Sequence, residues 1–188
     1  MRKTKLGPNA FPCPMPMTLI GATVDGRDNF LAAAWISRVN YDPPLIAIAL
    51  GKRHFTNPGI EANKAFSVNV PGSDLMAKTD YCGIVSGAKA DKSKLFTVFR
   101  GELTGAPMIE ECPLTMECRL YKTVDLPVDV LFIGEIVQSY SEDRFLTEGK
   151  PDVRKMSPFV LTMPDNGYWS IGKPLGQAWH AGKEIGSV

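Results

Sequence analysis

Short apolar segments separated by turn residues recur along the first third of the chain. Met17–Val24 is apolar and rich in β-branched residues, which predicts a strand, and the turn signal Asp25–Gly26 follows it. We expect Arg27–Asn29 to complete a polar hairpin loop, so that Phe30–Ile36 returns as a second strand. Leu45–Leu50 is an unbroken apolar run, which predicts a strand buried on both faces.

Two short helices and a further strand are predicted next. Asn57 as N-cap and Pro58 in the first turn indicate a helix that runs to about Lys64. In Phe66–Val70 apolar and polar residues alternate, so we expect one buried and one polar face. Apolar residues at helical spacing predict a second helix over Asp74–Cys82.

The rest of the chain again favours strands. Leu114–Thr123 alternates, and Val130–Val137 is a strand in which Gly134 indicates a bulge or a close backbone approach. Pro158–Met163 is the last predicted strand, and Tyr168–Val188 is expected to form an irregular arm with aromatic anchors. Many strands with short helices and no regular βαβ alternation predict a mainly β protein, an antiparallel barrel with helical excursions.

Composition narrows the class of protein. The chain has 188 residues, of which 44% are hydrophobic and 22% charged, as is ordinary for one soluble domain. A net charge of +1 without a basic stripe gives no reason to expect nucleic-acid binding. The longest apolar run is too short to span a membrane, and prolines interrupt the basic N-terminus before a signal peptide could form. We therefore expect a cytoplasmic protein.

The cysteines support a reducing compartment and no metal centre. They are widely spaced and include no C-x-x-C pair, whereas structural zinc sites usually have closely spaced ligand pairs. Cys82 would lie at a helix C-terminus, where the dipole does not favour a thiolate, so a packed, inert thiol is expected. The four are Cys13, Cys82, Cys112 and Cys118.

A basic loop, Gly51–Thr56, follows the apolar strand Leu45–Leu50 and leads into the first helix. Free backbone N–H groups and the helix dipole favour an anion at such a position, and basic and hydroxyl side chains would add to this. The sequence thus indicates a phosphate site here, with an ordinary basic surface loop as the alternative.

Several motifs in order resemble one family. The pattern W-I-S-x-V-x-x-D-P-P-L-I-A-I-A-L-G-K-x-x-x-T, together with FSVNVP, DYCGIVSG, Asp91–Lys92 and FIGEIV, is similar to the flavin reductase-like, FMN-binding split-barrel family and its flavoredoxin branch. The resemblance spans residues 12–182, so we expect a single domain over 1–188. It implies a split β-barrel and a homodimer with FMN near the subunit interface.

The resemblance also implies the residues around FMN. Trp35–Ser37 would lie beside the isoalloxazine ring, although a core position is the alternative for Trp35. Lys52, His54 and Thr56 would contact the phosphate or ribityl chain, and which basic side chain reaches the phosphate stays open. The full expected set is Ala33, Ala34, Trp35, Ile36, Ser37, Leu50, Lys52, Arg53, His54, Phe55, Thr56, Ser86, Gly87 and Lys92.

No other catalytic constellation stands out. The chain lacks the Rossmann and P-loop fingerprints, and its two histidines, His54 and His180, leave few ways to build a catalytic triad. A bound flavin would itself carry the redox chemistry, so no catalytic acid or base is required. We expect FMN to pass electrons from NAD(P)H or a redox protein to an acceptor. The alternative is a non-enzymatic module that binds FMN, another phosphate ligand, or haem through these histidines.

Overall fold

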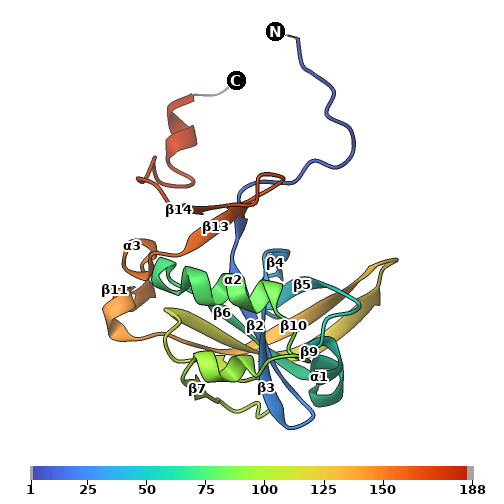
Figure 1. Ribbon diagram of the computed structural model, residues 1–188. Coiled ribbons are helices and arrows are strands. Elements are labelled where there is room, and N and C mark those ends of the chain that lie inside the picture. Colours follow the sequence, from blue (N-terminus) through green and yellow to red (C-terminus); the bar gives the residue numbers. More distant parts are fainter. Residues whose placement is uncertain (1, 186–188) are drawn as a thin grey trace.

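The computed structural model describes residues 2–185, apart from the side chain of Glu184. Its centre is a seven-stranded antiparallel sheet in the order β3-β2-β6-β9-β10-β5-β4 (Figure 1). The strands are β2 (Thr18–Val24), β3 (Arg27–Ala33), β4 (Ile36–Asn40), β5 (Leu45–Gly51), β6 (Ala65–Val70), β9 (Leu114–Asp125) and β10 (Asp129–Tyr140).

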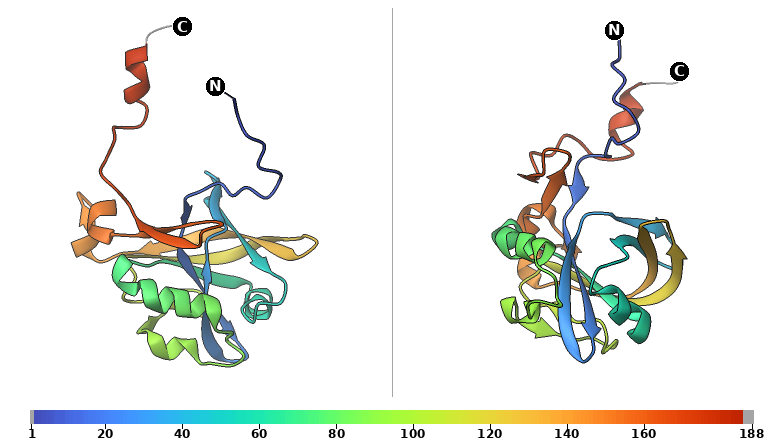
Figure 2. Two further views of the ribbon diagram at one scale, coloured as in Figure 1. Left: turned by 45° about the horizontal axis from the view of Figure 1, so that its top comes forward. Right: turned by 45° about the vertical axis from the view of Figure 1, so that its right-hand side comes forward.

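This sheet is rolled into an incompletely closed barrel. β3 and β4 form its two opposite edges, yet only Ala34 and Trp35 lie between them in the chain. Two residues span only a short distance, so the sheet must curl until its edges approach each other. The Ala49 amide donates to the Trp35 carbonyl at 2.9 Å and fixes this connection against β5. Figure 2 shows the curl from two further directions.

Smaller elements surround the barrel. A three-stranded sheet, a set of two-stranded pairs and short helices are built from β1 (Met15–Pro16), β7 (Val98–Phe99), β8 (Met108–Ile109), β11 (Leu146–Thr147), β12 (Lys150–Pro151), β13 (Phe159–Thr162), β14 (Gly167–Ser170), α1 (Asn57–Asn63), α2 (Met76–Ile84), α3 (Val153–Met156), and the 3₁₀ segments η1 (Ser73–Leu75), η2 (Lys92–Leu95), η3 (Asp143–Phe145) and η4 (Ala181–Ile185). Among residues 2–185, no helix has the length and apolar character needed to cross a membrane.

The inside of the barrel is a compact apolar core. It includes Ile48 of β5, Phe66 of β6 and Phe132 of β10, all fully buried. A Cβ atom at Gly134 would lie 2.6 Å from the Phe66 ring, so this position accepts only glycine without a shift. The register of β9 and β10 also changes between Ile133 and Gly134, which confirms the predicted irregularity.

A second apolar cluster lies outside the barrel, under α2. Leu19 and Phe30 from the sheet pack with Cys82 of α2 and with Phe96, and the rings of Phe30 and Phe96 meet edge to face at 5.5 Å. This cluster holds the end of α2 beside β3. That contact positions the C-terminal end of α2.

Two predictions about strands were wrong. Arg27–Asn29 belongs to β3 and not to a loop, because the turn consists of Asp25 and Gly26 alone, both at positive φ. The polar side chains of β6 are buried and not exposed. Asn69 explains why: its amide donates to the Leu19 carbonyl at 2.9 Å and accepts from the Ile109 amide at 2.9 Å.

The C-terminal segment only partly matches the expected irregular arm. β14 forms regular pairs with β13, and the Trp169 indole donates to the Thr162 hydroxyl at 2.8 Å. Residues 171–185, called here the arm, then extend away from the barrel (Figures 1 and 2). Residues 186–188 of the predicted arm lie outside the described part of the chain.

Candidate functional site

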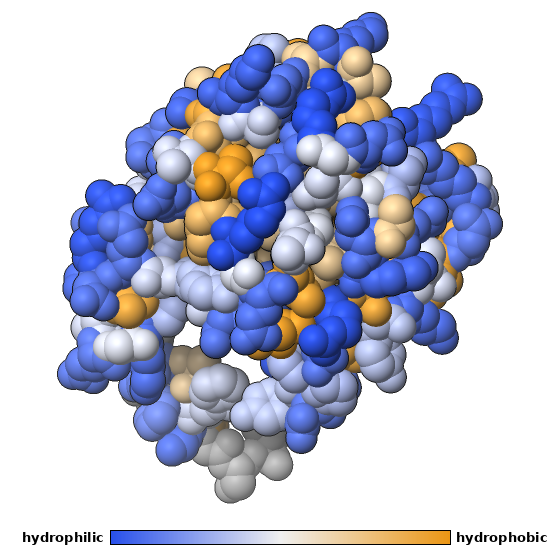
Figure 3. Space-filling model, turned by 90° about the horizontal axis from the view of Figure 1, so that it is seen from below, coloured by the Kyte–Doolittle hydropathy of each residue, from blue (hydrophilic) through white to orange (hydrophobic). Residues whose placement is uncertain are grey.

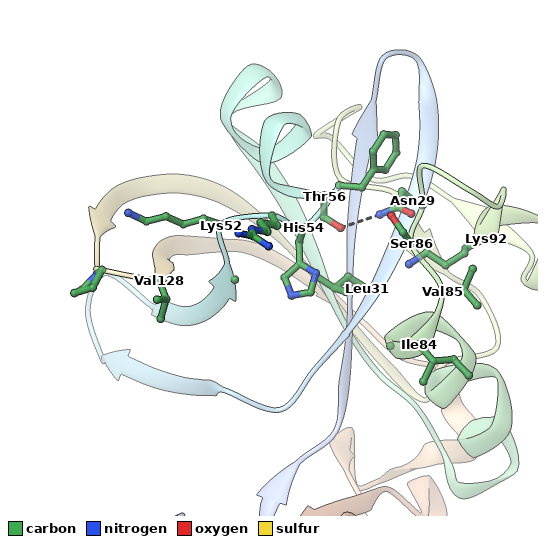
Figure 4. Close-up of a pocket in the computed structure, with 16 residues that line it drawn as sticks. Asn29, Leu31, Lys52, His54, Thr56, Ile84, Val85, Ser86, Lys92 and Val128 are labelled. Atoms are coloured by element: carbon green, nitrogen blue, oxygen red, sulfur yellow. Dashed lines mark hydrogen bonds between the residues drawn. The ribbon is translucent and has the colours of Figure 1, made fainter. Parts of the chain in front are cut away.

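A cavity of about 660 Å³, the main cavity, opens beside the barrel (Figure 4). Its walls come from β3, the loop between β5 and α1, the end of α2 with the loop that follows, and the turn between β9 and β10. The lining residues are Asn29, Leu31, Gly51, Lys52, Arg53, His54, Phe55, Thr56, Gly83, Ile84, Val85, Ser86, Gly87, Lys92, Pro127 and Val128.

Thr56 presents an unused hydroxyl proton at the floor of this cavity. Its side chain is only 1% exposed and makes no capping bond to α1, although it occupies the N-cap position. The amide of Asn29 donates to its hydroxyl oxygen at 2.8 Å (Figure 4). Because the oxygen is the acceptor in that bond, the hydroxyl proton remains available to an anionic ligand.

Lys92 brings a buried ammonium to the same cavity. The 3₁₀ turn that carries it begins at Asp91, whose carboxylate accepts from the Ser93 amide and hydroxyl at 3.2 and 2.6 Å. The Lys92 ammonium donates to the Cys82 carbonyl at 3.0 Å, and its described contacts include no carboxylate. Burial lowers the pKa of Lys92. An ammonium has three donors, so an anion in the cavity would satisfy a group that is otherwise costly to bury.

Arg27 and Gly87 fix the loop that follows α2. The Arg27 guanidinium donates to the Gly87 carbonyl and lies 5.2 Å from the centre of the Phe55 ring, so it joins two walls of the cavity. A Cβ atom on Gly87 would lie 2.1 Å from Asn29 Oδ1 and 2.6 Å from Phe55 Cδ1. Glycine is therefore needed here for close packing. Asn29 Oδ1, the atom that Gly87 approaches so closely, is buried without a hydrogen-bond partner.

The basic residues of the β5–α1 loop do not converge on the floor. Lys52 points toward the β9–β10 turn (Figure 4), where its ammonium pairs with Asp125 at 2.7 Å. Arg53 is exposed at the rim. The pKa of His54 is lowered by burial and then by the charge of Lys92, so its imidazole is neutral at pH 7. The predicted charge from this loop is thus weaker than expected, and the buried cation comes from Lys92.

The mouth of the cavity is apolar, in contrast to its floor. Ile84 at the end of α2 and Val128 in the β9–β10 turn are 73% and 74% exposed and lie on opposite sides of the opening (Figure 4). Leu31, Val85 and Pro127 continue this apolar lining. The arrangement suits a ligand with an anionic end and a flat apolar end.

The structure does not bring all the predicted site residues to the main cavity. Trp35 is 46% exposed, so the alternative of a core position for it was wrong. Ala33 and Leu50 are buried in the barrel core and do not line the main cavity. A separate hollow of about 480 Å³, called here the second cavity, is lined by Phe11, Pro12, Pro14, Met15, Pro16, Ala34, Trp35, Ile36 and Ser37.

Sequence reasoning missed Arg27 and Asn29 on β3, and Ile84 and Val128 at the mouth of the main cavity. Arg27, Asn29 and Leu31 are two residues apart and share one face of β3. That period-two pattern was the available signal, and it was hidden because the first two were assigned to a loop. Ile84 lies inside the motif DYCGIVSG, but nothing in that motif marks it as part of a cavity mouth, and Val128 lies in a turn outside the motifs. Only the fold places the two on opposite sides of one opening.

Two further interpretations can be judged from the geometry. His54 lines the main cavity whereas His180 lies on the arm, so the structure does not bring them together as two haem ligands. Cys82 is fully buried, and burial raises the pKa of its thiol to about 11. This agrees with the expected inert cysteine.

Comparison with known proteins identifies the family. The model of the family described as "Flavin reductase like domain" matches residues 11–151. The flavoredoxin of Methanosarcina acetivorans is 51% identical, with 98% of this chain and 100% of that chain covered at a TM-score of 0.96. The flavoredoxin of Desulfovibrio vulgaris (Miyazaki F) is 32% identical, with 96% and 100% covered at a TM-score of 0.90. "FMN reductase (NADH) RutF" of Bradyrhizobium diazoefficiens is 29% identical over 127 residues, 62% of this chain and 68% of the relative. The chain therefore belongs to the flavin reductase-like family, with the mainly β split-barrel fold and flavoredoxin likeness that its motifs predicted.

Proposed function

We propose that this chain binds FMN in the main cavity and passes electrons through it from a reduced donor, NAD(P)H or a redox protein, to an acceptor. The observation that carries the proposal is that the buried Lys92 ammonium and the free Thr56 hydroxyl line one cavity with an apolar mouth. The likeness to two flavoredoxins and to an FMN reductase supports the choice of flavin.

The residues of the main cavity fit both ends of this cofactor. Lys92, Thr56 and Ser86 offer an ammonium and two hydroxyls to the phosphate, and a buried ammonium with no carboxylate among its described contacts favours a dianion strongly. Ile84 and Val128 offer apolar surface to the ring at the mouth. FMN when bound supplies the group that accepts and donates electrons. The protein's task is to hold the phosphate end, orient the ring and limit the access of water.

The remaining expected contacts stay part of the proposal in a weaker form. Lys52, Arg53, His54, Phe55 and Gly87 line the main cavity along with the phosphate-end residues. A contact of Ala33, Ala34, Trp35, Ile36, Ser37 or Leu50 with FMN remains a prediction. We also propose that the chain acts as a single domain and as a homodimer.

The first experiment is a visible absorption spectrum of the protein as purified, followed by acid release and chromatography of the chromophore. We expect a flavin spectrum and release of FMN, and the emptied protein should quench the fluorescence of added FMN on titration. Riboflavin is the matched ligand control, because it lacks only the phosphate. Equal affinity for FMN and riboflavin would contradict the phosphate assignment, and no binding of either would overturn the function.

A second experiment separates a reductase from an electron carrier. The FMN-loaded protein is mixed anaerobically with NADH or NADPH, and the bleaching of the flavin absorbance is followed by stopped flow. Rapid bleaching with either nucleotide supports direct reduction. Absence of bleaching, with full reduction by dithionite, supports a carrier that takes electrons from a protein partner.

A further inference from the structure

The arm exposes large apolar side chains to an unusual degree. Leu175 and Trp179 have relative exposures of 103% and 92%, and Ile171 and Ile185 add 49% and 75%. Full burial of one such side chain is worth roughly 1.5–3 kcal/mol. A segment that holds several of them in solvent is typical of a surface that is covered in an assembly.

Contacts with the body of the same chain do not hold the arm. Its described hydrogen bonds stay within it: the His180 and Ala181 amides donate to the Gln177 carbonyl, and the Lys183 amide donates to the His180 carbonyl. The likeness to the Methanosarcina flavoredoxin nevertheless covers 98% of the chain at a TM-score of 0.96, which leaves out fewer residues than the arm contains. A segment that recurs in a solved structure without support from its own body points to support from another chain.

An apolar hollow lies at the end of the molecule from which the arm extends. The second cavity is formed by the segment Phe11–Pro16 and by the start of β4, and β1 and β4 both lie at that end of the barrel (Figures 1 and 2). Its volume of about 480 Å³ accommodates an aromatic side chain, and Trp35 supplies an aromatic wall. Seen from the opposite end, the surface is mainly hydrophilic, with apolar residues in small separate patches (Figure 3).

We propose that two copies of this chain exchange their arms, so that Trp179 of each copy fills the second cavity of the other. The arm and the cavity lie at the same end of the molecule, and one two-fold axis therefore makes both contacts at once. Tryptophan is favoured as the anchor of such contacts because it buries a large area at low entropic cost. The inference specifies the interface of the proposed homodimer and does not require bound flavin. It assigns the lining of the second cavity, Trp35 included, to contact with the arm of the other copy in place of the predicted contact with FMN.

Disulfide trapping tests the exchange directly. Cys13 is exposed and lies between Pro12 and Pro14, which line the second cavity, while the other three cysteines are buried. In the full chain carrying Ala178→Cys, mild oxidation is expected to link two chains through Cys13 of one and position 178 of the other. The double variant Cys13→Ser, Ala178→Cys is the control and should give no such link.

A mixing experiment reports the direction of the link. The wild-type chain is mixed with the double variant, which lacks Cys13, and one of the two carries an affinity tag. A linked pair containing one chain of each kind supports the exchange. Neither chain in this mixture carries both cysteines, so linked pairs of two like chains only, or no links at all, overturn the exchange.

Sedimentation equilibrium gives the second measurement. We expect the wild-type protein to be a dimer and Trp179→Ala to raise its dissociation constant roughly 30-fold, as for an interface anchor. Val153→Ala, which removes an exposed apolar side chain on α3, is the control and should leave the constant unchanged. A wild-type monomer, or a dimer insensitive to Trp179→Ala, overturns the proposal. Neither result depends on FMN binding, so a failure here is distinct from a failure of the flavin assignment.

Discussion

At the scale of single residues, the main cavity depends on one buried cation. Lys92 is 2% exposed and has a carbonyl as its described partner, whereas Lys52 already pairs with Asp125 at the surface. A hydrogen bond to a charged group contributes about 1.5–3 kcal/mol, and a surface ion pair contributes far less. The two lysines should therefore differ sharply in their importance for an anionic ligand.

The first prediction compares these lysines. Lys92→Met should weaken FMN binding roughly 10- to 150-fold, the factor that corresponds to about 1.5–3 kcal/mol, because the phosphate loses its buried cation. Lys52→Met should change the affinity less than about threefold, in keeping with a screened surface charge. Fluorescence titration of the emptied proteins measures both. An equal loss in the two variants would place the phosphate at the β5–α1 loop instead.

The second prediction concerns the protonation of His54. Its pKa is lowered from 6.5 by burial and by Lys92, and a phosphate bound beside Lys92 would offset that charge and raise the pKa again. Binding of FMN should then take up a proton, so affinity should increase as the pH falls from 7.5 to 6. His54→Gln should lack this part of the pH dependence, while the titration of FMN's own phosphate affects both proteins alike. Identical pH profiles would remove His54 from the phosphate environment.

The lowered pKa of His54 also predicts how the stability of the ligand-free protein depends on pH. Between the lowered pKa of folded His54 and 6.5, the unfolded chain binds more protons than the folded chain, so stability rises with pH in this window. Acidification through 6.5 should therefore destabilise the wild type more than His54→Gln. Urea unfolding at pH 7.5 and 5.5 provides the comparison.

At the scale of elements, the loop after α2 shows how packing shapes the site. Gly87 touches Asn29 Oδ1 and Phe55 so closely that a Cβ atom has no room, whereas a Cβ atom on Gly83 in α2 would meet only Ala32 Cβ at 3.4 Å. Both glycines line the main cavity. They form a matched pair, since one position rejects a methyl group and the other accepts it.

The third prediction uses this pair. Gly87→Ala should destabilise the protein by about 1–3 kcal/mol through overpacking and should weaken FMN binding, because the loop moves away from Asn29. Gly83→Ala should instead be neutral or stabilise by up to about 1 kcal/mol, as expected inside a helix. Chemical denaturation and FMN titration of both variants check this. If Gly87→Ala were as stable as the wild type and bound FMN with normal affinity, the loop would be more flexible than its contacts with Asn29 and Phe55 indicate.

The elements differ in how well the sequence predicted them. β5 could be recognised because a strand buried on both faces leaves an unbroken apolar run. The buried side of β6 could not, because Asn69 is paired with Leu19 and Ile109, which only the fold brings close. Polar residues read from sequence suggest solvent, and hydrogen bonds to distant backbone groups override that reading.

The site divides in the same way. Thr56 and Lys92 were among the predicted residues because they belong to ordered motifs, and the structure places both at one floor. The direction of Lys52 depends on Asp125 in a distant hairpin, and the place of Asn29 depends on the length of one turn. Neither property can be read from local sequence. The contribution of the basic loop to binding an anion was therefore overestimated, and the buried cation of the cavity is Lys92.

At the scale of the whole molecule, the main cavity joins parts of the chain from β3 to the β9–β10 turn. A ligand that bridges them should therefore stabilise the entire barrel. The fourth prediction is that FMN at 100 times its dissociation constant adds about 2.7 kcal/mol of stability, which corresponds to a rise in melting temperature of roughly 5–10 °C for a domain of this size.

Thermal unfolding by circular dichroism measures this stabilisation with and without FMN. Lys92→Met at the same FMN concentration should retain about half of the rise or less, because a roughly 10- to 150-fold weaker affinity leaves FMN at only about 10 to 0.7 times the dissociation constant of the variant. Riboflavin should also give a smaller rise than FMN. A full rise in the variant would contradict the role given to the buried ammonium.

The order of strands in the sheet also determines when each strand can pair during translation. β4 and β5 are made early, but β5 completes its pairing only with β10, which follows about 80 residues later, or roughly 4–16 s of translation. During that interval the apolar run Leu45–Leu50 has an unsatisfied edge, the kind of segment that pairs wrongly with other nascent chains. The strand that the barrel buries in the finished protein is therefore the segment most prone to mispairing during translation. Chaperone binding to the nascent chain is expected to concentrate on this strand.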